Sequence, residues 1–242
     1  MTAFFMAWGM FWIIPCPVKK WDIRLYPGML LCFPVIGLLL GVLWAFAARL
    51  CAAAGLLGAA VIAALPWLLT GFLHLDGFMD CADAVLSRRD RAERLRILKD
   101  SRVGAFSVIS LALLVLFGFA AAASADWSAR WTALLFVPAA VRAAAAGSVL
   151  CFPALPHSSY AKMFGTGVPK RCRVLAWAAA AVFSLCGVLM SGVCGLSALC
   201  GAAVTLGTVL ALRRNFGGMS GDISGCAVTL GELAALLLSA II

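Results

Sequence analysis

The sequence predicts an all-α, polytopic membrane protein with about seven transmembrane helices and a short N-terminal interfacial or re-entrant helix. Of the 242 residues, 64% are hydrophobic and only 12% are charged, whereas soluble domains have roughly 45–50% apolar and 25% charged residues. A soluble chain of this length could not cover its surface with so few polar side chains. No linker, repeat or soluble appendage interrupts the pattern, so we expect residues 1–242 to form a single domain.

The expected helices are apolar windows of about 20 residues, the length that crosses a hydrocarbon core of roughly 30 Å. The first apolar stretch, 3–16, is too short to span and ends at Pro15, Cys16 and Pro17, which favours an interfacial or re-entrant helix. It lacks the basic n-region and a convincing cleavage site of a signal peptide. The windows expected to span are 30–48, 55–73, 103–124, 131–150, 174–191, 192–212 and 223–242.

Basic side chains predict the orientation of these helices. The connections that would lie on the opposite side offer only Arg49 and Arg130. The positive-inside rule therefore places the N-terminus and the basic loops in the cytoplasm and the C-terminus outside. We read the net charge of +9 as topology and attraction to anionic lipid, and we expect no nucleic-acid partner. The basic loops are 19–24, 88–102, 162–173 and 213–214.

Acidic residues concentrate in 74–102, which holds six of the ten. If 74–86 continues the second span as a helix, Asp76, Asp80 and Asp83 form one stripe, a turn apart. Their repulsion, a few kcal/mol for each neighbouring pair at about 6 Å, can be relieved by protonation, by a bound cation or by the loop's arginines. Carboxylates at a membrane surface favour Mg²⁺, which keeps positions open for substrate phosphates. Gly77 leaves room there for a ligand or another backbone.

Four motifs carry a resemblance to a known family. The run HLDGFMDCADAV at 74–85 is followed by RAERLRILKDSRVGAF at 91–106, and FPVIGLLLG precedes both at 33–41. The segment GGMSGDISGCAVTLGE closes the series at 217–232. In this order, over nearly the full length, the chain resembles adenosylcobinamide-GDP ribazoletransferase, the cobalamin-5′-phosphate synthase of vitamin B12 assembly. The departures from the family pattern are Ala84, Leu98, Lys162 and Thr229, which replace the usual Gly, Met, Arg and an acid.

The resemblance implies a reaction and its machinery. Such an enzyme joins adenosylcobinamide-GDP to α-ribazole or its 5′-phosphate, forms adenosylcobalamin or its 5′-phosphate, and releases GMP. Attack of a ribose hydroxyl on a diphosphate requires positioning and charge neutralisation. We therefore expect Mg²⁺ on Asp76, Asp80 and Asp83, which are also candidate catalytic residues. Candidate general bases are His74, Asp100 and any of these aspartates that metal leaves free. Candidate substrate-binding residues are Gly77, Lys99, Arg102, Arg142, Lys162 and Asp222.

Several assignments stay open at this stage. Arg142 lies inside a span and should face the bundle interior and a partner, functional or structural. Asp222 could be a second metal or substrate contact. Lys99 and Arg102 share a face if the helix continues, and residues 88–96 are expected to form a basic amphipathic surface helix. The preferred acceptor, the lower-ligand base and the oligomeric state, including a homo-oligomer, also stay open.

Two other function classes compete with this interpretation. CDP-alcohol phosphotransferases also bring carboxylates and Mg²⁺ to a nucleotide diphosphate, but the AR of their DGxxAR motif is missing after Asp76 and Gly77. A small proton-coupled transporter would need acids in mid-span, whereas the acids here cluster at one membrane face apart from Glu232. We expect the enzyme in the lipid bilayer of a bacterial or archaeal cytoplasmic membrane, with its site facing the cytoplasm.

Overall fold

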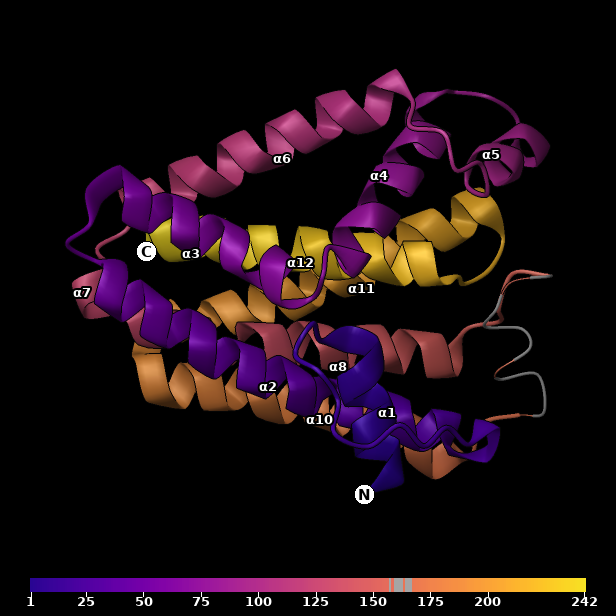
Figure 1. The fold of residues 1–242 in the computed structure, drawn as a ribbon, viewed down its shortest axis with the longest axis horizontal. Helices are drawn as coiled ribbons and strands as arrows, with labels where there is room; N and C mark the ends of the chain where they lie inside the picture. Colours follow the sequence, from indigo (N-terminus) through magenta and orange to yellow (C-terminus); the bar gives the residue numbers. More distant parts are fainter. Residues whose placement is uncertain (157, 159–162, 164–166) are drawn as a thin grey trace.

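The computed structural model describes residues 1–156, 158, 163 and 167–242, and this part of the chain is built from helices (Figure 1). The long elements are apolar on nearly every face, as expected of helices that are surrounded by lipid or by one another. In chain order the helices are α1 (Thr2–Phe11), α2 (Tyr26–Cys51), α3 (Gly55–Leu69), α4 (Leu73–Leu86), α5 (Arg91–Ile97), α6 (Ala105–Ser124), α7 (Trp127–Arg130), α8 (Val137–Cys151), α10 (Lys170–Ser191), α11 (Leu196–Phe216) and α12 (Gly221–Ile241). Short 3-10 turns lie at Ile23–Leu25, Trp131–Leu134 and Gly192–Gly195.

Helix α8 forms the centre of the bundle, where α2, α10, α11 and α12 all contact it. Its residues from Val137 to Leu150 are buried, and more than half of them are small: six alanines, one glycine and one serine. Small side chains let helix backbones approach closely in a membrane, where no hydrophobic force holds them together. Gly37 and Gly41 of α2 extend this contact, since a Cβ on Gly37 would lie 2.5 Å from the carbonyl oxygen of Pro138.

Five segments among the described residues are long and apolar enough to cross a membrane, or six if the bent pair α3–α4 counts as one span. One of the five, Lys170–Phe216, contains both α10 and α11. These two helices are separated at Gly192, where the backbone adopts a left-handed φ of 59°, and they pack against each other. The segment is therefore a hairpin that supplies both expected spans 174–191 and 192–212. The protein is a polytopic helical membrane protein, as predicted.

The second expected span, 55–73, is wrong in one respect. Helix α3 ends at Leu69, and α4 begins at Leu73 in a direction bent by 92°. Gly71 and Phe72 both have left-handed φ angles, 59° and 61°, which a continuous α-helix does not allow. The helix does not continue from the span into the acidic stretch. Residues 74–86 nevertheless form a helix of their own, so the predicted acidic stripe exists on α4.

Helix α1 is, as expected, too short to cross a membrane, with ten residues. It packs against α2, and the rings of Phe11 and Phe33 lie 4.1 Å apart between centroids. The backbone N–H of Ile13 donates to the carbonyl of Leu69 at 2.9 Å. The N-terminal segment therefore contacts the bundle where α3 ends.

Different elements lie at the two ends of the bundle (Figure 1). At one end lie α5 and the first residues of α2, α10 and α12, which carry or adjoin the predicted basic loops. At the other end lie α7 and the C-terminus, where Arg130 donates to the carbonyls of Ser239 and Ala240. The fold therefore places the described parts of the predicted basic loops at a single end of the bundle.

Candidate active site

The predicted acidic stripe lines a cavity of about 270 Å³, which we call the acid cavity. Asp76, Asp80 and Asp83 reach it from α4, and the loop 98–103 closes it on the other side. His74 lies on the opposite side of the same helix, because residues on an α-helix are separated by about 100°. The structure therefore brings the three aspartates together but leaves His74 behind them.

Asp222 joins this group through a close contact between α4 and α12. A Cβ on Gly77 would lie only 2.7 Å from the carbonyl oxygen of Asp222 and 2.8 Å from its Cα. Of the two roles left open for Gly77, the structure favours approach of another backbone. The charges of Asp76, Asp222 and Asp83 all act on Asp80, so the four carboxylates lie near one another, and we call them the acid cluster.

Ser220 begins α12 and sets the direction of Asp222. Its hydroxyl accepts a hydrogen bond from the backbone N–H of Ile223 at 3.3 Å, which is the usual N-cap arrangement. The same hydroxyl donates to Asp222 Oδ2 at 3.3 Å. The first turn of α12 therefore presents its carboxylate beside α4.

Asp83 differs from its neighbours because both of its carboxylate oxygens already accept hydrogen bonds. Oδ2 accepts from the N–H of Gly104 at 2.6 Å, and Oδ1 accepts from the N–H of Ser107 at 3.0 Å. A Cβ on Gly104 would lie 2.5 Å from Asp83 Oδ1, so this contact requires glycine. Asp83 thus satisfies the free N–H groups at the start of α6 and ties that helix to α4.

The cationic side chains of the acid cavity come from a loop. Helix α5 ends at Ile97, so Lys99 and Arg102 do not share a helical face, although both side chains line the cavity. Arg102 forms an ion pair with Asp100 at 2.7 Å. Hydrogen bonds from Arg102 hold the pKa of Asp100 at about 2. Asp100 is therefore a poor general base in this arrangement, because it gives up a proton too readily.

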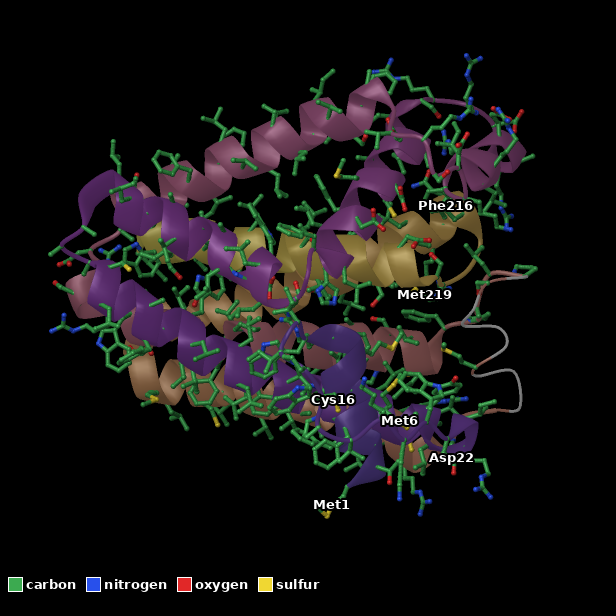
Figure 2. All side chains as sticks on the ribbon, viewed as in Figure 1. Met1, Met6, Cys16, Asp22, Phe216 and Met219 are labelled. Carbon is green, nitrogen blue, oxygen red and sulfur yellow. The ribbon has the colours of Figure 1, made fainter. Side chains whose placement is uncertain are left out.

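A second cavity of about 530 Å³ adjoins the first, and we call it the apolar cavity. Leu98 and Lys99 line both cavities and so form part of the wall between them. Asp222 and Arg91 also line the apolar cavity. Its lining comes from segments far apart in the sequence: α5 and the loop after it, residues 155–158, and the start of α12. Figure 2 labels Phe216 and Met219, which lie on the connection that leads from α11 to this start of α12.

Helix α5 is docked on the bundle and is not a free amphipathic surface helix. Arg91 Nε donates to the carbonyl of Phe216 at 2.9 Å, and Arg94 Nη1 donates to Asn215 Oδ1 at 2.8 Å. Both partners lie in the last turn of α11, where a cation is favoured by the helix dipole. Sequence reasoning missed Arg91, and the available signal was its position at the start of the motif RAERLRILKDSR.

Two predicted site residues lie in the bundle interior, away from both cavities. Arg142 is fully buried and pairs with Glu232 at 2.6 Å, so it has the interior partner that its position predicted. His74 is buried against the ring of Phe33, with centroids 5.7 Å apart, and its Nε2 has no hydrogen-bond partner among the described residues. The structure does not bring either side chain to the acid cluster. Lys162, a further candidate, lies outside the described residues.

The acid cluster can be tested against the requirements of a metal ion. In the described parts of the chain, no three His, Cys, Asp or Glu side chains converge closely enough to enclose a metal. No described Lys or Arg pairs with Asp76, Asp80 or Asp222 either, since the ion pairs lie elsewhere. Mg²⁺ is commonly bound by one or two protein carboxylates, and phosphate oxygens of the substrate complete its coordination. Such carboxylates need to be free of cationic partners and to adjoin a space for phosphate. The residue types therefore fit a magnesium ion that binds together with substrate.

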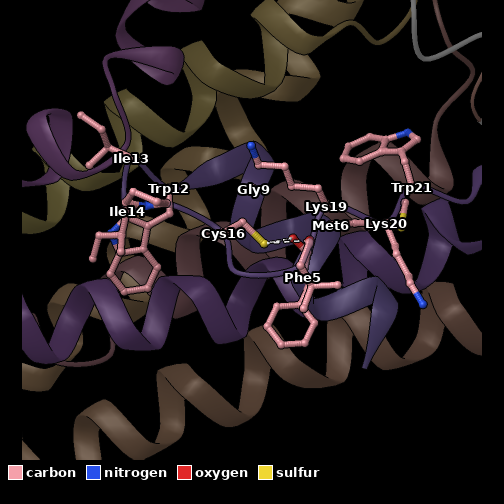
Figure 3. Close-up of a pocket in the computed structure, with 12 residues that line it drawn as sticks. Phe5, Met6, Gly9, Trp12, Ile13, Ile14, Cys16, Lys19, Lys20 and Trp21 are labelled. Atoms are coloured by element: carbon pink, nitrogen blue, oxygen red, sulfur yellow. Dashed lines mark hydrogen bonds between the residues drawn. The ribbon is translucent and has the colours of Figure 1, made fainter.

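A separate cavity of about 360 Å³ lies between α1 and the segment that follows it (Figure 3). Cys16 Sγ donates to the carbonyl of Phe5 at 3.3 Å across its floor. Aromatic and aliphatic side chains form most of its walls, and Lys19 and Lys20 lie beside them. No predicted site residue lines this cavity, so we do not assign the chemistry to it.

Comparisons with known proteins identify the family of this chain. The family model described as cobalamin-5-phosphate synthase matches residues 3–240. An adenosylcobinamide-GDP ribazoletransferase of Clostridium perfringens (strain 13 / Type A) is 37% identical over 242 residues, which cover 98% of this chain and 96% of that protein.

Two further relatives, from other organisms, carry the same name. Proteins of the same name from Clostridium botulinum (strain Alaska E43 / Type E3) and Stutzerimonas stutzeri (strain A1501) are 36% and 38% identical. The matches cover 96% and 86% of this chain and 94% and 84% of those proteins. No solved structure matches. The coverage and identity of these matches mean that this membrane protein is a transferase that belongs to the cobalamin-5-phosphate synthase family.

Proposed function

We propose that the protein transfers the adenosylcobinamide phosphate group of adenosylcobinamide-GDP to α-ribazole or α-ribazole 5′-phosphate. A ribose hydroxyl of the acceptor attacks the phosphorus attached to cobinamide, a new P–O bond forms, and the P–O bond to GMP breaks. The hydroxyl proton passes to a protein base, and GMP leaves. The observation that carries this proposal is the unpaired cluster of Asp76, Asp80 and Asp222 beside Lys99 and Arg102.

The acid cluster is the proposed binding site for Mg²⁺. We assign Asp76, Asp80 and Asp222 as the carboxylates that hold the ion, and we give Asp83 a structural role because backbone N–H groups engage both of its oxygens. When bound, Mg²⁺ would offset the negative charge of the diphosphate and of the cluster. Lys99 and Arg102 supply further positive charge from the loop, and the planar guanidinium suits two phosphate oxygens at once.

The general base is best sought within the cluster itself. A carboxylate that does not contact metal can accept the hydroxyl proton at hydrogen-bond distance. His74 is less suitable because its ring is buried on the far side of α4. Asp100 is less suitable because Arg102 lowers its pKa, which makes it a weak base, and donates hydrogen bonds to both of its carboxylate oxygens.

Orientation in the membrane is part of the proposal. The acid cavity lies at the end of the bundle that adjoins the basic loops. By the positive-inside rule this end faces the cytoplasm of a bacterial or archaeal cell. Nucleotide substrates and Mg²⁺ would then reach the site directly from the cytosol.

The test is GMP release by purified protein in liposomes that receive adenosylcobinamide-GDP. We expect release to require α-ribazole or its 5′-phosphate, to stop in EDTA and to return with added Mg²⁺. Arg102→Ala should reduce turnover sharply. Arg102→Lys should recover only part of it, because the lysine ammonium cannot donate the two parallel hydrogen bonds that the planar guanidinium offers. No GMP release with either acceptor, from protein that is folded and loaded with Mg²⁺, would overturn the proposal.

A further inference from the structure

The apolar cavity lies beside the acid cavity but has a different chemical character. Leu95, Leu98, Leu155 and Pro156 supply apolar walls. Its volume, about 530 Å³, lies within the range of roughly 300–1,000 Å³ that is typical of small-molecule sites. Such walls suit a flat, apolar ring system. Polar side chains complete the lining: Arg91, Lys99, Ser158, Ser220 and Asp222.

Arg91 is the cation of this cavity that sequence reasoning did not assign. Its Nε is fixed on the carbonyl of Phe216, whereas the other described residues offer its two Nη groups no hydrogen-bond acceptor. The next residue along, Gly217, has no side chain, and a Cβ there would collide with the Arg91 guanidinium. The carbonyl of Phe216 therefore fixes the Arg91 guanidinium, and the N–H donors of its two Nη groups stay available. A held guanidinium with free donors is suited to an oxyanion with several acceptor oxygens.

We propose that the apolar cavity binds the acceptor nucleotide and that Arg91 binds its 5′-phosphate. This inference rests on the proposed function and deepens it, because it names which acceptor the site is built to recognise. The α-ribazole base is a dimethylbenzimidazole, which has no amino or amide group and fits walls of leucine and proline. The ribose then lies toward Asp222, which lines the same cavity and faces Asp80 of the acid cluster.

The arrangement of the two cavities favours the acceptor over the guanosine of the other substrate. In-line displacement requires the attacking and leaving oxygens on opposite sides of the phosphorus. Lys99 lies in the wall that the cavities share, next to the proposed diphosphate position. With the acceptor in the apolar cavity, GMP leaves on the side of the acid cavity.

The experiment measures KM and kcat for α-ribazole and for α-ribazole 5′-phosphate, with adenosylcobinamide-GDP saturating. For Arg91→Ala we expect KM for the phosphorylated acceptor to rise about ten- to a hundred-fold, the loss expected for hydrogen bonds to a charged group. KM for α-ribazole should stay within about two-fold of that of the unaltered protein, because that acceptor has no phosphate. Arg91→Lys should give an intermediate KM for the phosphorylated acceptor only.

Two arginines of the same helix provide matched controls. Arg96→Ala removes an equal charge that pairs with Glu93 on the exposed face, and it should leave both KM values unchanged. Arg94→Ala loosens the docking of α5 through Asn215 without removing a residue of the cavity, so any effect should fall equally on both acceptors. If Arg91→Ala does not yield folded protein, Arg91→Lys carries the test alone.

The outcomes separate this inference from the proposed function. Equal changes for both acceptors in the Arg91 variants, or a change only in KM for adenosylcobinamide-GDP, would overturn the role of Arg91. A bulky Leu95→Trp substitution should raise KM for both acceptors, and normal KM values in that variant would contradict the location of the acceptor. Failure of the unaltered protein to release GMP with either acceptor would instead refute the proposed function, and this inference with it.

Discussion

Gly77 of α4 and Asp222 of α12 meet without a side chain between them, and the position for a Cβ on Gly77 lies 2.7 Å from the Asp222 carbonyl oxygen. The contact fixes the start of α12 against the acidic helix. Because Asp222 is thereby held beside Asp80, the proposed metal site depends on a residue that has no functional group of its own.

Gly77→Ala should therefore damage the site although alanine favours helices. The added methyl group must displace the backbone of α12, and overpacking of this kind typically costs about 1–3 kcal/mol. We expect a lower melting temperature in detergent and a loss of GMP release. Gly207→Ala in α11 is the matched control, because a Cβ there meets nothing within 4 Å. That variant should be neutral or slightly stabilised, and equal behaviour of the two variants would show that the close contact is unimportant.

Asp80 and Asp83 should respond differently to the same substitution. Asp80→Asn removes one of four clustered charges, so we expect turnover to fall by orders of magnitude while the melting temperature stays the same or rises. Asp83→Asn keeps one acceptor oxygen where two backbone N–H groups of α6 need partners. It should lower stability by about 0.5–2 kcal/mol, the usual effect of a lost helix cap. If Asp83→Asn lost all turnover at an unchanged melting temperature, Asp83 would be a metal ligand and not a structural residue.

The buried pair Arg142 and Glu232 should matter for stability more than for substrate binding. Glu232→Gln leaves the Arg142 charge unpaired in the bundle interior, a change that typically costs about 3–5 kcal/mol. The double variant Arg142→Met with Glu232→Leu should recover much of this loss, since an apolar pair of similar volume needs no counter-charge. Thermal unfolding in detergent checks both expectations.

The exposed pair Glu93 and Arg96 is the control for this comparison, and Glu93→Gln should change the melting temperature little. If Arg142→Met instead raised KM for adenosylcobinamide-GDP without affecting stability, Arg142 would be a substrate contact after all.

The orientation of the bundle can be tested by labelling of single added cysteines in inverted and right-side-out vesicles. Arg89→Cys lies in a basic loop and should react with an impermeant maleimide only from the cytoplasmic side. Ala129→Cys, in α7 at the opposite end, should react only from outside. The ten native cysteines are all free, so labelling of the unaltered protein provides the background. Reaction of Arg89→Cys from the outside would show that the predicted orientation is wrong and that the site does not face the cytosol.

The sequence by itself determined the class of the protein and most of its helical segments. Hydropathy windows depend only on the residues within them, and a run of about 20 apolar residues has one stable solution in a bilayer, a helix. The spacing of Asp76, Asp80 and Asp83 likewise fixed their common stripe, because helical periodicity is local. The motifs around them were sufficient to recognise the family.

Only the tertiary structure decided how these pieces form a site. The bend of 92° between α3 and α4 arises where two successive residues, Gly71 and Phe72, adopt left-handed backbone angles. Apolarity does not report such angles, so the hydropathy pattern predicted one continuous span. Two sets of hydrogen bonds also join segments that are distant in the sequence. Asp83 accepts hydrogen bonds from the N–H groups at the start of α6, and Arg91 donates one to the carbonyl of Phe216. Such contacts depend on how whole helices pack, and no local pattern of residues encodes them.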